Sequence, residues 1–211
     1  MPARDGDTLD FYAAQAQAYA GRDREAENAL IARFTALLQP SARILELGCG
    51  GGQDSAAMLA QGFDVVPSDG SPELAAEAGR RLGVPVRVLL FEDLDEVEAY
   101  DAVWAHASLL HVPRAALPGI LARIARALRP GGVFFASFKA GEAEGRDRFG
   151  RYFNYPSEDW LRGAYGAESW TSIAIEDATG SGYDTEPTRW LHVFAVKNAF
   201  AIKQASAVKN A

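Results

Sequence analysis

Two acidic residues flank a glycine-rich segment in the first third of the chain. The segment ILELGCGGGQDS runs from Ile44 to Ser55, and Glu46 precedes its first glycine, Gly48, by two residues. Glycines let the backbone turn sharply and let a ligand approach it closely. A carboxylate inside a strand that should be buried is costly unless it is paired or hydrogen-bonded. The pattern indicates a ligand-binding turn; the alternative is a tight turn with only a structural role.

Asp69 is the second acid, and it ends the next strand-like segment, 17 residues after Gly52 (69 − 52). In an open parallel sheet, ligands bind beyond the carboxyl ends of the strands. A carboxylate at that edge can accept hydrogen bonds from both hydroxyls of a ribose. The alternative role is capping the helix that begins at Pro72, for which Ser71 is better placed. We therefore expect Asp69 to bind the ribose of a nucleotide-like cofactor.

Apolar runs alternate with amphipathic segments over most of the chain, which predicts a parallel sheet with helices on both faces. Strands are expected at 42–47, 63–66, 84–90, 102–105 and 133–138. Helices are expected at 9–20, 25–38, 55–60, 72–82, 114–128 and 157–164. Two further strand-like runs, 170–175 and 190–196, are separated by a turn-rich segment. They predict an antiparallel hairpin that closes one edge of the sheet.

The chain has 211 residues, of which 48% are hydrophobic, and this is enough for one domain with a full core. We expect residues 1–40 to form an N-terminal helical cap of that domain, 41–197 to form its main part, and 198–211 to be a tail. The net charge of −7 and the pI near 5.0 disfavour nucleic acids and membrane surfaces as partners. A single cysteine, with neither a signal peptide nor a membrane span in view, predicts a cytoplasmic protein.

Four segments resemble motifs of the class I S-adenosylmethionine-dependent methyltransferases. They are ILELGCGGG for the first motif, SDGSPEL after the second strand, ALRPGG before the fifth strand, and FYAAQAQAY for the N-terminal helix. Together they cover most of residues 11–138, in the order that the family has. The resemblance implies an α/β fold, a Rossmann-like doubly wound sheet of seven strands with order 3-2-1-4-5-7-6 and strand 7 antiparallel. It also implies S-adenosylmethionine as the cofactor and methyl transfer as the reaction.

The resemblance further implies which residues bind the cofactor. Glu46 and the backbone of Gly48–Gly52 would hold its methionine part, Asp69 its ribose, and the end of the third strand its adenine. Many relatives have an acid there for the adenine amino group, but this chain has Leu90, which leaves Phe91 for packing and Glu92 as a substitute acceptor. The full set of expected cofactor-binding residues is Tyr19, Glu46, Gly48, Cys49, Gly50, Gly52, Asp69, Gly70, Phe91, Glu92 and Ala105.

A dinucleotide is the alternative cofactor, because its fingerprint also places glycines after the first strand and an acid after the second. The third glycine of that fingerprint falls on Gln53, and Glu46 has no evident role beside a pyrophosphate. An NAD-dependent oxidoreductase is therefore the weaker alternative. A module that binds S-adenosylmethionine without turnover is a further alternative.

Methyl transfer requires alignment and exclusion of water, and a base helps when the acceptor loses a proton. His106 and His111, in WAHASLLHVPR, follow the fourth strand and are the expected catalytic residues. As alternatives, His106 is a packed residue and His111 caps the helix after Pro113. His192 alternates with apolar residues in the last strand and is expected to be structural.

The segment KAGEAEGRDRFGRYFNYPSEDW follows the fifth strand, and its arginine and aromatic residues suit an anionic or planar acceptor. The alternative is a solvated loop whose arginines pair with its own acids, Glu142, Glu144 and Asp147. Tyr12 and Tyr19 are seven residues apart and share a helix face. The resemblance implies that Tyr19 covers the cofactor, and packing on the core is the alternative. The expected substrate-binding residues are Tyr12, His111, Arg151 and Tyr152. The predicted partner is a small-molecule methyl acceptor; no metal is expected, and the chain is expected to be a monomer or homodimer.

Overall fold

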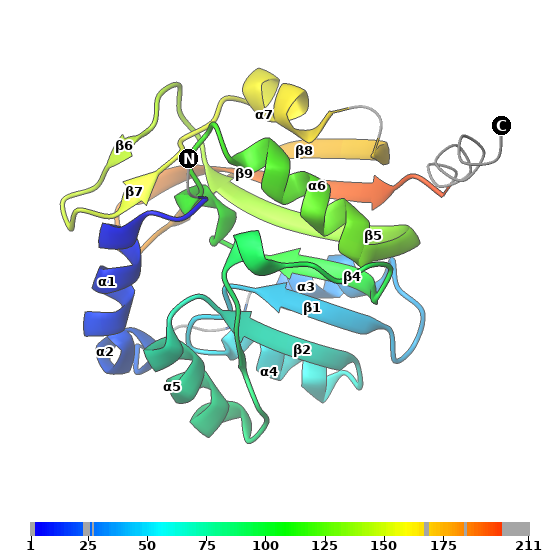
Figure 1. Cartoon of the computed structure of the whole chain (residues 1–211), viewed down its shortest axis with the longest axis horizontal. Coiled ribbons are helices and arrows are strands. Elements are labelled where there is room, and N and C mark those ends of the chain that lie inside the picture. The colour runs from blue at the N-terminus through cyan, green and yellow to red at the C-terminus, as the bar shows by residue number, and fades with distance from the viewer. Residues whose placement is uncertain (1–2, 23–25, 27, 167–168, 184, 200–211) are drawn as a thin grey trace, which may run out of the picture.

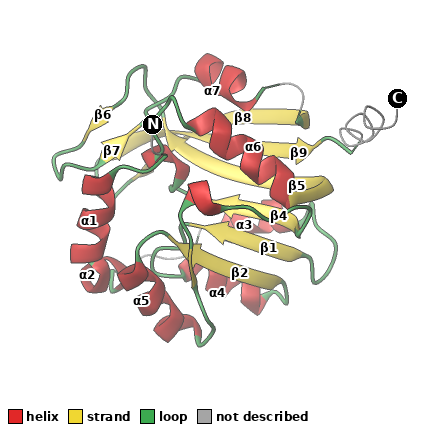
Figure 2. Ribbon diagram, viewed as in Figure 1, coloured by secondary structure: helices red, strands yellow, loops and turns green. Residues whose placement is uncertain are grey.

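A seven-stranded sheet forms the centre of the molecule (Figures 1 and 2). The structure is a computed structural model, and it describes residues 3–22, 26, 28–166, 169–183 and 185–199. The strand order is β3-β2-β1-β4-β5-β9-β8, in which only β9 runs antiparallel to its two neighbours. This confirms the expected topology, since β9 and β8 take the places of strands 7 and 6. The sheet strands are β1 (Arg43–Leu47), β2 (Asp64–Asp69), β3 (Arg87–Val88), β4 (Tyr100–Ala105), β5 (Leu128–Lys139), β8 (Trp170–Ser181) and β9 (Pro187–Lys197).

Helices cover the sheet on both faces, as the alternation of segments predicted. Figure 1 shows α6 (Leu117–Ala127) and α7 (Glu158–Tyr165) on the viewer's side of the sheet, and α3 (Asn28–Thr35) and α4 (Gln53–Ala60) behind it. Alternate strand residues divide between two cores. Phe134 packs in the core with α6 and α7, whereas Phe135 packs in the core with α3 and α4.

The remaining elements lie near the carboxyl ends of the parallel strands. In Figure 1, α1 (Gly6–Ala14), α2 (Ala16–Ala20) and the small ribbon of β6 (Gly145–Arg146) and β7 (Tyr152–Phe153) lie at that end of the sheet. Helix α5 (Pro72–Leu82) packs against α1 and α2. Two short 3₁₀ turns, η1 (Phe91–Asp93) and η2 (Leu109–His111), follow β3 and β4. These segments surround the edge where ligands bind in such sheets.

Several predicted boundaries differ from those of the structure, and three of the differences have a clear local cause. The predicted strand at 84–90 shortens to β3, because Pro85 cannot donate to the ladder of an edge strand. The predicted helix at 114–128 begins instead at Leu117, where Pro118 occupies the first turn. The predicted helix at 9–20 begins at Gly6, because the Asp5 side chain accepts a hydrogen bond from the Thr8 backbone N–H at 2.9 Å.

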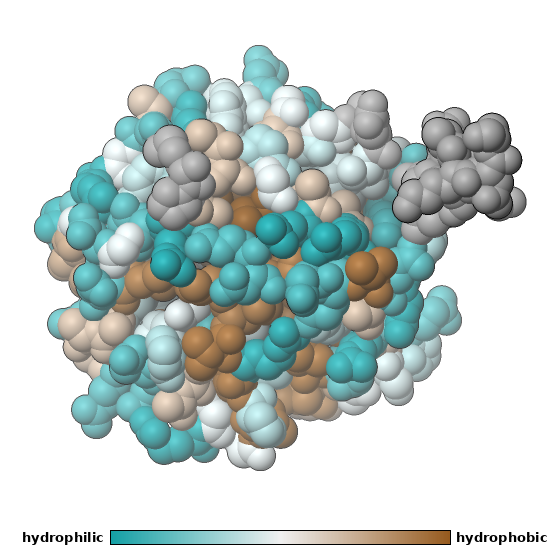
Figure 3. Space-filling model, in the orientation of Figure 1, coloured by the Kyte–Doolittle hydropathy of each residue, from teal (hydrophilic) through white to brown (hydrophobic). Residues whose placement is uncertain are grey.

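The predicted tail, 198–211, lies outside the described residues from residue 200 onward. Within the described part of the chain, no helix has the length and hydropathy of a bilayer-spanning segment. The face in Figure 3 is mostly hydrophilic, with apolar residues gathered across its middle.

Candidate functional site

The glycine loop after β1 is a tight turn that has no room for side chains. Gly48, Gly50 and Gly52 have φ angles of 78°, 56° and 82°, in the left-handed region that glycine adopts without strain. A Cβ on Gly48 would lie 2.5 Å from Cβ of Ser108, and one on Gly50 would lie 3.2 Å from Cε1 of Tyr19. The loop therefore packs closely against the segment after β4 and against α2.

Asp69 lies at the end of β2 and holds the glycine loop in place. Its Oδ2 accepts a hydrogen bond from the Gly50 N–H and its Oδ1 from the Ser71 N–H, both at 2.9 Å. The side chain that caps α5 is Ser71, whose Oγ accepts from the Leu74 N–H at 3.2 Å, as predicted. Burial raises the pKa of Asp69 to about 6 against the opposing effect of the backbone N–H groups. Each carboxylate oxygen has a further lone pair for a ligand hydroxyl.

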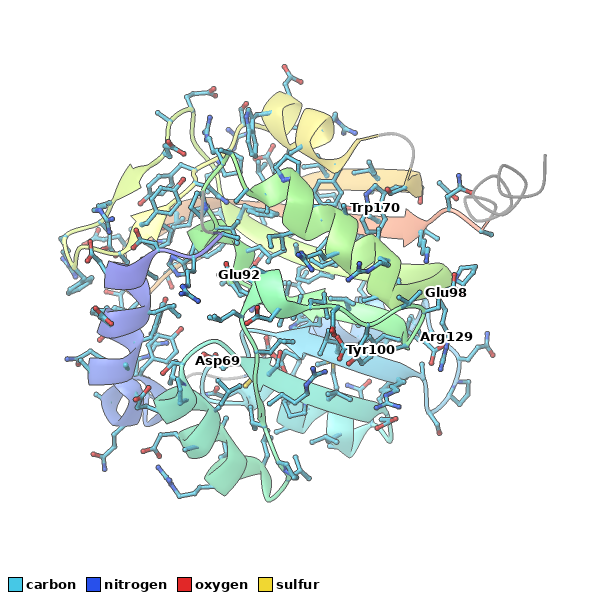
Figure 4. The ribbon with its side chains drawn as sticks, viewed as in Figure 1. Asp69, Glu92, Glu98, Tyr100, Arg129 and Trp170 are labelled. Atoms are coloured by element: carbon cyan, nitrogen blue, oxygen red, sulfur yellow. The ribbon has the colours of Figure 1, made fainter. Side chains whose placement is uncertain are left out.

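A pocket opens beside this loop, and we call it the glycine-loop pocket. It encloses about 700 Å³ of space, solvent at its mouth included. Figure 4 shows Asp69 and Glu92 at the end of the sheet that faces α1 and α2. Of the expected cofactor-binding residues, seven line this pocket: Tyr19, Gly48, Gly50, Asp69, Gly70, Phe91 and Glu92.

Two buried oxygens in the wall of this pocket have no hydrogen-bond partner in the described part of the protein. They are Oγ of Ser108 and Oε2 of Glu92. Buried polar atoms are normally satisfied, so each orphan points to a missing partner. These acceptors, the backbone cradle of Gly48 and Gly50, and the Asp69 carboxylate fit a ligand with a ribose and further donor groups. The residues present thus suit an adenosyl cofactor.

The other four expected cofactor-binding residues, Glu46, Cys49, Gly52 and Ala105, do not line the pocket. Glu46 Oε2 accepts a hydrogen bond from the Ser55 hydroxyl, and burial raises the pKa of Cys49. Gly52 is the N-cap of α4, where an added Cβ would lie 3.1 Å from the Leu82 side chain, and Ala105 is fully buried in β4. The wall after β4 is formed instead by Ala107 and Ser108.

A second, larger pocket lies beyond the ends of β4, β5 and β9, and we call it the strand-end pocket. It encloses about 1670 Å³, solvent included, and its wall contains Tyr19, Ala107 and His111, which also line the glycine-loop pocket. Ala107 has a φ of 51°, which is uncommon for a residue with a side chain. The two pockets therefore share a wall of three residues.

His111 stands in this shared wall with both ring nitrogens engaged. A carbonyl only accepts, so Nδ1–H donates to the Tyr152 carbonyl oxygen at 2.6 Å, which leaves Nε2 to accept from the Tyr12 hydroxyl at 2.9 Å. The Arg151 guanidinium donates to the same hydroxyl at 3.1 Å. Burial lowers the pKa of His111 to about 4, so the ring is neutral at physiological pH.

His106 lies in the strand-end pocket and is oriented by Asp54, a buried residue of α4. Oδ2 of Asp54 accepts from the Trp104 indole N–H and stands 3.2 Å from Nδ1 of His106. That oxygen accepts from both rings, so Nδ1 carries the proton and Nε2 is the basic nitrogen of the neutral imidazole. A carboxylate that orients a histidine in this way is the usual support of a general base.

Three of the four expected substrate-binding residues meet in the structure, because the Tyr12 hydroxyl is hydrogen-bonded to both His111 and Arg151. His111 lines both pockets, whereas Tyr12 lines only the glycine-loop pocket and Arg151 only the strand-end pocket. Tyr152 lines neither; its hydroxyl donates to Glu144 at 2.6 Å, and its pKa rises to about 12, mainly through burial.

Two arginines of the segment after β5 form ion pairs. Arg151 pairs with Asp147 at 2.6 Å, as the alternative interpretation held, while Arg146 reaches out of the segment to Asp5 at 2.7 Å. Arg151 also remains part of the pocket wall, so pairing and pocket lining occur together.

Lys139 and His192 also line the strand-end pocket. Lys139 was not among the residues expected to form a site, and His192 was expected to be structural. A signal was present in β5, where Phe135, Ser137 and Lys139 share one face that turns polar toward the strand's carboxyl end. In the ladder, Ser137 lies opposite His192. No group of three or more possible metal ligands occurs among the residues that the structure describes.

Comparison with known proteins identifies the sheet and the loop. Residues 44–132 match a family model described as "Methyltransferase domain". Over 103 residues the chain is 39% identical to a ubiquinone biosynthesis O-methyltransferase of Xylella fastidiosa, an alignment that covers 46% of this chain and 41% of that protein. The chain thus spans less than half the length of the curated relatives that it matches.

Solved structures resemble the whole fold. A Burkholderia thailandensis 1,6-didemethyltoxoflavin-N1-methyltransferase, solved with 1,6-didemethyltoxoflavin and S-adenosylhomocysteine, superimposes with a TM-score of 0.69, at 24% identity over 91% of this chain and 88% of that one. The magnesium protoporphyrin IX methyltransferase of Synechocystis PCC 6803 has a TM-score of 0.67, at 18% identity over 92% and 99% of the two chains. Residues 44–132 are thus similar to a methyltransferase domain, and the strand order and the glycine loop give the chain the fold of these methyltransferase structures.

Proposed function

We propose that the protein transfers a methyl group from S-adenosylmethionine, bound in the glycine-loop pocket, to a small molecule bound in the strand-end pocket. The observation that carries this proposal is the shared wall of Tyr19, Ala107 and His111. In-line displacement needs donor and acceptor in adjoining sites from which water is excluded. A module that only binds the cofactor has no need of a second, larger pocket beside it.

Different residues of the glycine-loop pocket would bind different parts of the cofactor. We assign the ribose hydroxyls to Asp69 and the adenine edge to Glu92, whose Oε2 is buried and unsatisfied. The Ser108 hydroxyl and the backbone of Gly48 and Gly50 are assigned to the methionine part. An NAD-dependent enzyme is disfavoured because Gln53 stands where the dinucleotide fingerprint has its third glycine.

When bound, S-adenosylmethionine supplies a methyl group on a sulfonium, whose C–S bond electrons return to sulfur as the acceptor's lone pair forms the new bond. We propose that a hydroxyl oxygen of the acceptor makes the attack, in keeping with the names of the curated relatives, which are O-methyltransferases. The proton of that hydroxyl goes to Nε2 of His106, which Asp54 orients. His111 is a positioning residue that fixes the Tyr12 hydroxyl through Nε2.

Calorimetric titration with S-adenosylhomocysteine, S-adenosylmethionine and NAD tests the cofactor. We expect both sulfur compounds to bind and NAD not to bind. Incubation with methyl-deuterated S-adenosylmethionine and a panel of hydroxylated small molecules, read by mass spectrometry, then tests transfer. Binding without any labelled product would favour the non-catalytic module, and binding of NAD alone would support the oxidoreductase.

His106→Asn separates the two histidine roles, because asparagine retains a donor toward Asp54 but cannot act as a base. With the acceptor found in the panel, kcat should fall about 100-fold or more while KM changes little. His192→Asn, in the same pocket, is the matched control and should keep most of the activity. An unchanged kcat in His106→Asn would remove His106 from the reaction and leave methyl transfer itself in place.

A further inference from the structure

Two of the three residues that the pockets share, Ala107 and His111, belong to one short segment after β4. We call residues 107–112 the wall segment; it contains η2 and no part of a strand or an α-helix. Its first residue, Ala107, has a φ of 51° and donates its N–H to Oγ of Ser137 in β5 at 2.8 Å. A backbone in a sparsely populated conformation keeps its shape only when the surrounding structure fixes it. The contacts of the wall segment therefore decide how the two pockets are placed relative to each other.

Asn154, which follows β7, binds the wall segment through three hydrogen bonds. Its side-chain Nδ2 donates to the carbonyl oxygens of Leu109 at 3.0 Å and Val112 at 3.1 Å. Its backbone N–H donates to the Leu110 carbonyl oxygen at 2.8 Å. One residue, 42 or more positions later in the chain, thus binds carbonyls on both sides of His111.

The neighbours of Asn154 complete this attachment. The carbonyl oxygen of Tyr152 accepts the His111 Nδ1–H at 2.6 Å. The Arg114 guanidinium, just after the wall segment, donates to the carbonyl oxygens of Asn154 at 2.8 Å and Tyr155 at 2.6 Å. Side chain and backbone of residues 152–155 are therefore connected to the segment that separates the pockets.

The environment of Asn154 indicates a role other than ligand contact. The residue is fully buried and lines neither pocket. The two carbonyls at one end of its amide identify that end as the nitrogen, and the Oδ1 at the other end has no hydrogen-bond partner in the described part of the protein. A buried acceptor without a partner opposes folding. The distinctive contribution of Asn154 is therefore a pair of donors directed at the wall segment.

We propose that Asn154 is a positioning residue for methyl transfer, which acts through the wall segment on the placement of the acceptor relative to the donor. The inference rests on the proposed function, because it assigns a role in the same reaction. A displacement of the reacting atoms by about 1 Å can slow an in-line attack about 100-fold. Loss of the Asn154 donors should therefore impair alignment more than it impairs the binding of either ligand.

Asn154→Leu tests the attachment, because leucine has a similar volume and no donors. The first readout is the His111 Nδ1–H signal in proton–nitrogen correlation NMR spectra, assigned from its absence in His111→Gln. In the wild type the Tyr152 carbonyl oxygen accepts this proton, so the signal should be protected from exchange with water. In Asn154→Leu the signal should shift, and its exchange should be about tenfold faster or more. An unchanged signal overturns the proposal.

Methyl transfer to the acceptor found in the panel, with methyl-deuterated S-adenosylmethionine as the donor, gives the second readout. In Asn154→Leu, kcat should fall about 30-fold or more, whereas KM for the acceptor should change by less than about threefold. The calorimetric affinity for S-adenosylhomocysteine should also stay within about threefold of the wild-type value. If Asn154→Leu does not fold, Asn154→Ser, which retains one donor, should show a smaller loss of kcat with the same split. An unchanged kcat in the variant that folds overturns the proposal.

Thr35→Val is the matched control for a lost buried hydrogen bond. Thr35 is a buried residue of α3 that lines neither pocket, and its hydroxyl donates to the Ala32 carbonyl oxygen at 3.3 Å. This variant should lose stability but keep both kcat and the His111 signal of the wild type. Equal losses of kcat in Thr35→Val and Asn154→Leu would show general loosening of the fold and overturn the assignment to Asn154.

The wild-type protein separates this inference from the proposed function. Failure to bind S-adenosylhomocysteine, or to form any labelled product, would reject the proposed function, and the role of Asn154 in transfer would fall with it. The NMR signal would still show whether Asn154 fixes His111. Product formation by the wild type with an unchanged kcat in Asn154→Leu would reject only the role of Asn154.

Discussion

The two pockets meet at three residues but are built from different parts of the polypeptide. Backbone turns and carboxylates form the glycine-loop pocket, where Gly48 and Gly50 have positive φ angles and Asp69 fastens the loop. Side chains from distant elements form the strand-end pocket, where Lys139 comes from β5 and His192 from β9. The first pocket therefore tolerates almost no change in shape. The second depends on single side chains that come from several elements.

The largest expected effect comes from adding one methyl group to the glycine loop. Gly48→Ala should abolish measurable binding of S-adenosylhomocysteine, since its Cβ would clash with Cβ of Ser108 at 2.5 Å. Gly62→Ala is the matched control, because Gly62 also has a positive φ, 86°, but nothing stands within 4 Å of its Cβ position. It should bind normally in calorimetry. Equal losses in the two variants would mean that backbone strain, and not the shape of the pocket, controls binding.

The strand-end pocket should instead depend on a buried ion pair for its stability. Asp147→Asn leaves the Arg151 charge uncompensated and should lower the free energy of unfolding by about 3 kcal/mol in urea denaturation. Asp177→Asn, which breaks the exposed pair with Arg189, should leave stability nearly unchanged. If both variants unfold like the wild type, the wall of this pocket is not held by the Arg151–Asp147 pair.

A smaller effect is expected when the ribose acceptor is neutralised. Asp69→Asn should weaken S-adenosylhomocysteine about 100-fold, or about 2–3 kcal/mol, because hydrogen bonds to a charged group are lost. Asp64→Asn, at the exposed start of the same strand, is the control. Unchanged affinity in Asp69→Asn would contradict the assignment of the ribose to this residue.

The smallest expected effect is a pH dependence of cofactor binding. The pKa of Asp69 is raised to about 6, so its carboxylate becomes protonated as the pH falls through that value. If the ionised form binds the ribose, affinity for S-adenosylhomocysteine should be constant above pH 7 and fall about tenfold by pH 5. Asp69→Asn should lose this dependence. A rise in affinity toward pH 5 would contradict the proposed charge state.

The sequence allowed the glycine-loop pocket to be predicted better than the strand-end pocket, and the reason is the range of the interactions. Gly48, Gly50 and Asp69 act through local backbone conformation and the end of a strand, which a short pattern reveals. Ser108 was missed because nothing in its sequence neighbourhood indicates that it packs against Gly48. The alternation of segments predicted a parallel sheet with helices on both faces, and the strand order followed from the resemblance to a known family. The start of α1 depended on the unnoticed Asp5 cap.

The strand-end pocket depends on strand pairing and side-chain contacts between residues far apart in the sequence, which no local pattern reveals. His192 faces this pocket because β9 inserts antiparallel between β5 and β8 and brings it opposite Ser137. The two histidines after β4 looked alike in sequence, and only their partners differ: Asp54 orients His106, while Tyr12 occupies the basic nitrogen of His111. From the sequence, Arg151 could bind a ligand or form an ion pair. In the structure it pairs with Asp147 and also lines the strand-end pocket.

Tyr19 links the shapes of the two pockets. Its ring borders both pockets and stacks on Tyr183, so the short helix α2 is fastened to the connection between β8 and β9. A displacement of α2 that moves Tyr19 would therefore change the glycine-loop pocket and the strand-end pocket together. The position of one ring thereby sets the shape of both pockets.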